Sequence, residues 1–143
     1  MNVTKQCVEC ERKFQTYKQN AKTCSKVCGN AHYRKQTGRV SSGLSNGVVG
    51  AMSEMQVSID LMKKGYSVFR ALSPACFCDL VVVKDGLVLN VEVRTGYRNP
   101  NTGNLAYPKI KNGNEKIHYF AVFVPQTNSI HFFNEEFESV ELS

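Results

Sequence analysis

The stretch CDLVVVKDGLVLNVEVRTG, residues 78–96, decides the fold of this 143-residue chain. Its Val- and Leu-rich segments predict two strands, Phe77–Val83 and Leu87–Arg94. Asp85-Gly86 lies between them and favours a tight two-residue turn, because both positions of such a turn need a positive φ. The two strands are therefore expected to pair as an antiparallel hairpin.

Outward from this hairpin, the sequence predicts an α/β domain with one mixed sheet. Upstream, Ala51–Lys64 has the periodicity of a helix, and Gly65 stands where that helix is expected to end. Downstream, residues 96–116 are rich in Gly, Asn, Pro and Lys and are expected to form a long crossover loop. The remaining strands are predicted at Tyr66–Leu72, Tyr119–Val124 and Ile130–Phe133.

Composition divides the chain into three parts. Residues 1–40 contain four of the six cysteines and nine Lys/Arg against two acidic residues, a net charge of +7. Residues 41–50 (SSGLSNGVVG) are uncharged and rich in Ser and Gly, which predicts a linker. Residues 51–143 contain the long apolar segments and have a net charge of −1. The basic part indicates an arm that binds a polyanion, and a basic surface that only confers solubility is the alternative.

The chain is expected to be a cytoplasmic protein without a membrane partner. No segment approaches the roughly 20 apolar residues of a membrane-spanning helix. Residues 1–6 lack the apolar core of a signal peptide. Because disulfides are rare in the cytoplasm, the cysteines of residues 1–40 are expected to bind metal. Cys76 and Cys78 lie apart from them and are expected to be small buried side chains.

The metal ligands expected in residues 1–40 are Cys7, Cys10, Cys24 and Cys28. Two close thiolate pairs separated by a short loop suit tetrahedral Zn²⁺. Four sulfur ligands leave no open position for water, so this zinc is expected to be structural. So few large aliphatic residues cannot form a sufficient core, and the metal is expected to supply the folding energy.

The strings CVECERKF (7–14) and TCSKVCGNAHYRK (23–35) resemble the treble-clef-like zinc fingers of bacterial and phage proteins. In those fingers the second cysteine pair opens a basic helix. His32 is an alternative ligand, although an exposed position on that helix is favoured. Arg34, Lys35 and Arg39 are expected to contact phosphates of a nucleic acid, and a protein-binding role for the finger is the alternative.

Three acidic residues of the predicted α/β domain are candidates for metal ligands. Asp79 begins an otherwise apolar strand, and Glu92 lies on the neighbouring strand. With the Val93 carbonyl they form an oxygen set that suits Mg²⁺ or Mn²⁺, although unrelated polar residues at strand ends are the alternative. On the predicted helix, Glu54 falls between two apolar flanks, where a carboxylate needs a partner. One flank is Met52, Met55, Ile59 and Met62, and the other is Val57 and Leu61.

These residues resemble the PD-(D/E)xK nuclease superfamily, in particular its homing-endonuclease and Holliday-junction-resolvase branches. The resemblance rests on Ser53-Glu54, Gly65-Tyr66-Ser67-Val68, Cys78-Asp79-Leu80 and Glu92-Val93-Arg94-Thr95-Gly96. It implies a restriction-endonuclease-like core of a helix, a three-stranded meander, a helix and a strand. It also implies an endonuclease that hydrolyses DNA phosphodiester bonds with Asp79, Glu92 and Glu54 as catalytic carboxylates, of the kind found in phages and mobile elements.

Arg94 stands where the superfamily usually has lysine. A guanidinium can neutralise the scissile phosphate, but it cannot exchange a proton at neutral pH. If catalysis needs that proton, the chain is a nucleic-acid-binding protein that retains the nuclease fold. A zinc-finger adaptor without a nucleic-acid role is a third hypothesis.

Further contacts with DNA are expected from residues near these carboxylates and in the crossover. Double-strand cutting by an enzyme with one site suggests a homodimer. The expected nucleic-acid contacts are Arg70, Ser73, Arg98, Lys109 and Lys111.

Overall fold

The computed structural model describes residues 1–37, 43–109 and 116–143. Contacts between Cα atoms divide the chain into two compact units. One contains Met1–Ser42 and Asn99–Asn104, and the other contains Gly43–Arg98 and Leu105–Ser143. Among the described residues, no helix has the length and apolar character needed to cross a membrane.

The hairpin predicted from residues 78–96 is confirmed. Strands β4 (Leu80–Lys84) and β5 (Leu87–Thr95) pair antiparallel, with Leu80 opposite Val91. The φ angles of Asp85 and Gly86 are 51° and 79°, and two positive values are what a type I′ turn requires. The register places Asp79, which immediately precedes β4, next to Glu92 on β5.

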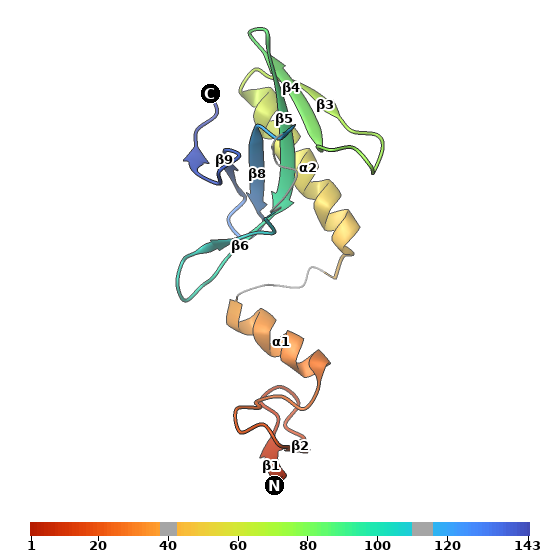
Figure 1. Ribbon diagram of the computed structural model, residues 1–143, viewed down its shortest axis with the longest axis vertical. Coiled ribbons are helices and arrows are strands. Elements are labelled where there is room, and N and C mark those ends of the chain that lie inside the picture. Colours follow the sequence, from red (N-terminus) through yellow and green to blue (C-terminus); the bar gives the residue numbers. More distant parts are fainter. Residues whose placement is uncertain (38–42, 110–115) are drawn as a thin grey trace. The chain divides into compact units, whose positions relative to one another are not determined.

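One six-stranded mixed sheet is built around this hairpin (Figure 1). Its strand order is β10-β9-β8-β5-β4-β3, and β5 and β8 form the parallel pair. The predicted α/β class and mixed sheet are therefore confirmed. The outer strands have the bounds β3 (Ser67–Arg70), β8 (Tyr119–Val124), β9 (Ser129–Phe133) and β10 (Ser139–Val140).

Helix α2 (Asn46–Lys63) packs against β5, β8, β3 and β4 of this sheet (Figure 1). It begins five residues before the predicted start, because the Ser45 side chain accepts a hydrogen bond from the Val48 N–H and caps the helix. Residues 46–50 of the predicted linker are therefore helical. The helix ends before Gly65, which has a φ of 88°.

The predicted orientation of this helix is wrong. Its buried residues are Ser53, Val57 and Leu61, whereas Met52, Met55, Ile59 and Met62 are exposed. The sequence pattern contains two separate apolar faces, and only one of them packs against the sheet. The prediction treated the two apolar faces as one and therefore placed the expected buried face midway between them.

Two apolar clusters form around the sheet. The larger contains Val57 and Leu61 of α2 together with alternating residues of β4, β5 and β8. The smaller contains Cys78, Ile117 and Phe120. Cys78 is thus buried as expected, whereas Cys76 is exposed and the prediction for it is wrong.

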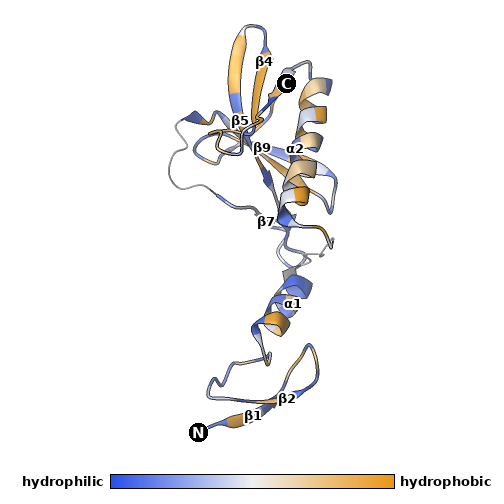
Figure 2. Cartoon of the chain, turned by 90° about the vertical axis from the view of Figure 1, so that its right-hand side faces the viewer, coloured by the Kyte–Doolittle hydropathy of each residue, from blue (hydrophilic) through white to orange (hydrophobic). Residues whose placement is uncertain are grey.

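The described part of the crossover between β5 and β8 contains a hairpin that the sequence did not predict. Strands β6 (Tyr97–Arg98) and β7 (Leu105–Ala106) pair antiparallel. The first unit contains β1 (Val3–Gln6), β2 (Lys13–Thr16) and α1 (Lys26–Thr37). Figure 2 shows that α1 is mainly hydrophilic, whereas the β4–β5 hairpin and α2 are largely hydrophobic.

Replacing Gly96 with alanine is expected to destabilise the chain. A Cβ atom there would lie 2.5 Å from Cγ1 of Val122 and 3.1 Å from the Ala106 carbonyl oxygen. We expect Gly96→Ala to lower the free energy of unfolding by about 1–3 kcal/mol, measured by urea denaturation. Gly50→Ala is the matched control, because nothing lies near that position and alanine favours the helix. Equal stabilities of the two variants would contradict this packing.

Candidate functional site

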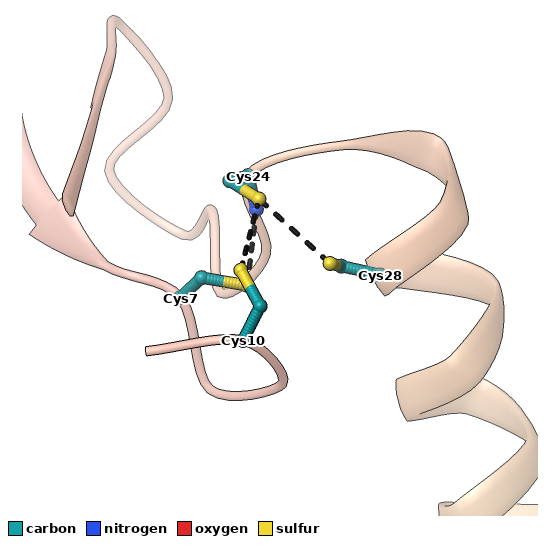
Figure 3. A group of neighbouring side chains, drawn as sticks. All are labelled: Cys7, Cys10, Cys24 and Cys28. Carbon is teal, nitrogen blue, oxygen red and sulfur yellow. Dashed lines mark hydrogen bonds between the residues drawn. The ribbon is translucent and has the colours of Figure 1, made fainter. Parts of the chain in front are cut away.

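Four cysteine sulfurs converge in the first unit (Figure 3). The ligand atoms of Cys7, Cys10, Cys24 and Cys28 all lie within 4.8 Å of one another. The Sγ of Cys24 is 3.4 Å from that of Cys10 and 3.7 Å from that of Cys28. Sulfurs around tetrahedral zinc are about 3.8 Å apart, because each Zn–S bond is about 2.3 Å long. The predicted set of cysteines is therefore a cluster that could hold a metal ion.

Local backbone bonds position these sulfurs. The Cys7 N–H donates to the Arg12 carbonyl at 2.9 Å, and the Glu11 N–H donates to the Cys7 carbonyl at 2.9 Å. These bonds close the turn that contains Cys7 and Cys10. The second pair is oriented by α1, where the Ser25 side chain accepts a hydrogen bond from the Cys28 N–H.

The charge state of the cluster fits a cation. Burial by itself raises the pKa of Cys7, but backbone N–H groups of Cys10, Glu9 and Cys24 lower it to about 6. A hydrogen bond with the neighbouring Cys10 raises the pKa of Cys24 to about 12. A second thiolate is thus disfavoured beside the first, and a divalent cation that binds all four sulfurs would remove this penalty.

His32 lies outside the sulfur cluster, as expected from the sequence. Its Nδ1 is 3.3 Å from Glu9 Oε1, and its Nε2 is 2.9 Å from Gln36 Nε2. Lys35 Nζ lies 2.7 Å from Glu9 Oε2, and this ion pair is the first cause that lowers the pKa of Glu9. Lys35 therefore has a partner within the chain, and both Arg34 and Lys35 are exposed on α1. Arg39 lies outside the described residues.

Asp79, Glu92 and Arg94 meet at the paired ends of β4 and β5. Arg94 Nη1 is 2.5 Å from Glu92 Oε1 and 3.9 Å from Asp79 Oδ2. It also donates to the Val93 carbonyl at 2.9 Å. The predicted oxygen set therefore does converge, and the guanidinium nitrogen lies among its members.

Burial makes both carboxylates unusual. It is the first cause that raises the pKa of Asp79, although the Val93 N–H donates to Asp79 Oδ2 at 2.7 Å and opposes the shift. Burial also raises the pKa of Glu92, and the attraction of Arg94 offsets only part of this. Two acidic groups that are costly to ionise and that share one cation form an oxygen-only set suited to a hard divalent ion.

Glu54 is close to this pair but has its own partner. Its Oε2 accepts hydrogen bonds from Arg70 Nε at 3.0 Å and Nη2 at 2.8 Å. Within the described residues, only the four cysteines form a group of potential metal ligands within 4.8 Å, so Glu54 does not share such a group with Asp79 and Glu92. Its charge nevertheless contributes to the raised pKa values of both.

Ser53 positions the helix relative to β5, a role that the sequence pattern did not predict. The side chain is almost fully buried, its Oγ lies 2.6 Å from Thr95 Oγ1, and it donates to the Val49 carbonyl. The signal available in the sequence was the spacing of Ser53, Val57 and Leu61, which lie four residues apart and therefore on one face of a helix.

The other predicted nucleic-acid contacts lie in different places. Ser73 accepts a hydrogen bond from the Ala75 N–H in an exposed turn. Arg98 Nη2 is 3.4 Å from His131 Nε2. Lys109 Nζ lies 5.3 Å from the ring centroids of both Tyr107 and Phe137. Arg70, by contrast, contacts the predicted catalytic carboxylate of Glu54. Lys111 lies outside the described residues.

Comparison with solved structures assigns the architecture. The fold is similar to that of a bacterial homing endonuclease. The TM-score to this enzyme, I-Ssp6803I, is 0.58 over 69% of this chain and 78% of that chain, with 20% sequence identity. No protein-family model and no curated protein sequence matches the chain. At this identity the likeness establishes the fold alone.

Metal bound by the cysteine cluster is expected to fold the first unit. Purified chain should contain one equivalent of zinc, and Cys24→Ser should remove it and reduce helical circular dichroism. The measurements are elemental analysis by mass spectrometry and far-ultraviolet spectra. Cys76→Ser is the matched control, because Cys76 is exposed and lies outside the cluster. Zinc retention by Cys24→Ser would contradict the assignment.

Asp79→Asn is expected to raise the melting temperature at pH 7. Burial raises the pKa of Asp79 above its unfolded value, so the charged form destabilises the folded chain. This penalty disappears as the pH falls through the folded pKa towards the unfolded value of about 4, and the two melting curves should converge there. A difference that grows as the pH falls would contradict this origin.

Proposed function

We propose that this chain is a metal-dependent endonuclease of the PD-(D/E)xK type that hydrolyses DNA phosphodiester bonds. The observation that carries the proposal is the convergence of Asp79 Oδ2, Glu92 Oε1 and the Val93 carbonyl around one cationic nitrogen of Arg94. A buried Glu92 and a partly buried Asp79, both with raised pKa values, are typical of functional sites. The similarity of the fold to a homing endonuclease supports the same function.

Asp79, Glu92 and the Val93 carbonyl are the groups that would hold Mg²⁺ or Mn²⁺. Such an ion supplies an activated water and stabilises negative charge on the phosphate. In the overall reaction, oxygen from water bonds to phosphorus, the ester P–O bond breaks, and the leaving oxygen is protonated. The β4–β5 register fixes the two carboxylates, and the hydrogen bond from the Val93 N–H orients Asp79.

The two arginines of the site have separate roles in this proposal. Arg94 neutralises the scissile phosphate, a task that a permanently charged guanidinium can perform. Arg70 holds Glu54 by two hydrogen bonds at the margin of the site. From there Glu54 acts on the ion through its charge or through a bridging water, and not as a direct ligand.

One observation favours a second candidate, a DNA-binding protein that has lost cleavage. The Arg94 guanidinium contacts Glu92 and the Val93 carbonyl and lies 3.9 Å from Asp79, so its positive charge stands where that of an ion would be. Metal binding therefore requires Arg94 to turn away. If the free energy needed to move Arg94 exceeds the free energy of ion binding, the chain keeps the fold and the affinity for DNA but does not cut.

The first unit is proposed as a zinc finger that adds affinity for the DNA backbone. Residues 1–40 have a net charge of +7, whereas the remainder has −1. Lys26, Arg34 and Lys35 all lie on α1 and are exposed. Phosphate contacts of this kind give binding that weakens with salt and selects no sequence.

The decisive experiment is cleavage of supercoiled DNA by the full chain with Mg²⁺, Mn²⁺ or EDTA. We expect divalent metal to be required, and Asp79→Asn and Glu92→Gln to lower the rate by about 10²–10³-fold or more. Arg94→Lys should keep cutting, whereas Arg94→Gln should lose it. Asp85→Asn removes a carboxylate on the exposed hairpin turn and should cut normally.

DNA binding by the same variants separates the candidate functions. Salt-sensitive binding without any product in Mn²⁺ would support the non-cutting alternative. Absence of binding at low salt would favour a zinc-finger adaptor. The melting temperature of the wild-type chain should rise with Mg²⁺, and that of Asp79→Asn should not, which tests metal binding without reference to cleavage.

A further inference from the structure

Helix α2 exposes a continuous apolar stripe, which consists of Val48, Met52, Met55, Ile59 and Met62. Each of these side chains is between 42% and 54% exposed. Their spacing of four, three, four and three residues keeps all five on one side of the helix. Such spacing is typical of a helix that packs along another helix.

The stripe lies on the side of α2 opposite the sheet. At about 100° per residue, its centre is roughly 180° from the buried face of Ser53, Val57 and Leu61. The stripe is therefore not part of the core of its own unit. It is about 21 Å long, because the helix rises about 1.5 Å per residue.

The flanks of the stripe argue against nucleic acid and membranes as the occupant. Ala51 and Ser58 border one side, and Gln56 borders the other. Lys63, at the end of the helix, is the one cation close to the stripe among the residues of α2. A DNA-binding face needs several cations, and a helix that lies on a membrane has Lys and Arg along its polar side.

The chain's own zinc-finger unit also fits poorly. Its helix α1 is mainly hydrophilic and its residues are strongly basic (Figure 2). A second copy of α2 offers the complementary surface instead. The stripe is nearly symmetric about Met55, because Val48 and Met62 lie seven positions before and after it. Two copies of the stripe can therefore pack against each other in the antiparallel direction.

We propose that α2 forms the interface of a homodimer, in which the stripes of two copies pack antiparallel around a two-fold axis near Met55. The same patch is then used by both partners, as in most homodimers. The antiparallel direction also places opposite ends of the helix dipoles side by side. Lys63, the one cation beside the stripe, would face the opposite end of the partner's helix, so the antiparallel pairing brings no like charges together.

The area predicts a reversible dimer. Five half-exposed side chains of this size form a patch on the order of 400 Å², which is large for a surface without a partner. Two such patches bury roughly 800 Å², below the usual size of about 1,600 Å² for a stable complex. The dimer is therefore expected to dissociate in the micromolar range of concentration.

The dimer leaves the proposed nuclease site accessible. Glu54 lies on the same helix but about 100° away from Met55, beside the sheet. The proposal does not rest on nuclease activity, since it follows from the exposed side chains alone. A chain that never cuts DNA can still dimerise, so the two proposals fail separately.

The test measures the mass of the full chain in solution by sedimentation and light scattering over a range of concentrations. The wild-type mass should rise to that of a dimer, whereas Met55→Glu and Met55→Lys should each stay monomeric. Because the two-fold axis brings Met55 next to its copy, an equimolar mixture of the two variants should restore the dimer. Circular dichroism and melting curves establish that each variant is folded.

Leu87→Glu is the matched control, because Leu87 is an exposed apolar residue at the start of β5. It should dimerise like the wild type. A monomeric wild type at all concentrations, or a dimer unaffected by Met55→Glu, would overturn the proposal. If Met55→Glu fails to fold, Met55→Gln is measured as the monomeric variant instead. If both charged variants fold and their equimolar mixture stays monomeric, the proposed dimer is also overturned.

Discussion

Asp79 and Glu92 are acidic side chains that the register of β4 and β5 forces into a largely buried corner of the sheet. Arg94 is the cation that the same register supplies. The charges stabilise one another only in part, since burial still raises the pKa values of both carboxyl groups. The backbone must therefore hold this arrangement against its own electrostatic cost, and the tight turn, the buried strand β8 and the Ser53–Thr95 hydrogen bond all serve that purpose.

The two units of the chain are stabilised by different physical means. The larger unit has a sheet with apolar clusters around it, and its order comes from burial. In the smaller unit, Cys7 is the one fully buried apolar residue among those described in residues 1–37, and it belongs to a cluster of four cysteines that could hold a metal ion. The basic residues of the smaller unit are tolerated because little apolar surface has to be buried there.

Sequence patterns predicted the elements that depend on local chemistry. The Asp85-Gly86 turn, the strand Tyr119–Val124 and the cysteine cluster could be read directly, because turn geometry, apolar alternation and ligand spacing are local properties. The orientation of α2 could not, since its sequence contains two apolar faces and nothing local decides which one meets the sheet. The partners of Glu54 and Lys35 could not be predicted from the sequence either, because each pairs with a residue distant in the sequence.

The parallel pairing of β5 and β8 has a consequence for the order of folding. Asp79 and Glu92 lie on a hairpin closed by two residues, whereas β5 and β8 pair across a crossover of more than twenty residues. Loop closure over such a span costs more chain entropy than closure of a hairpin. The carboxylates are therefore expected to meet early, before the central strand β8 docks, and this late step is expected to limit the folding rate.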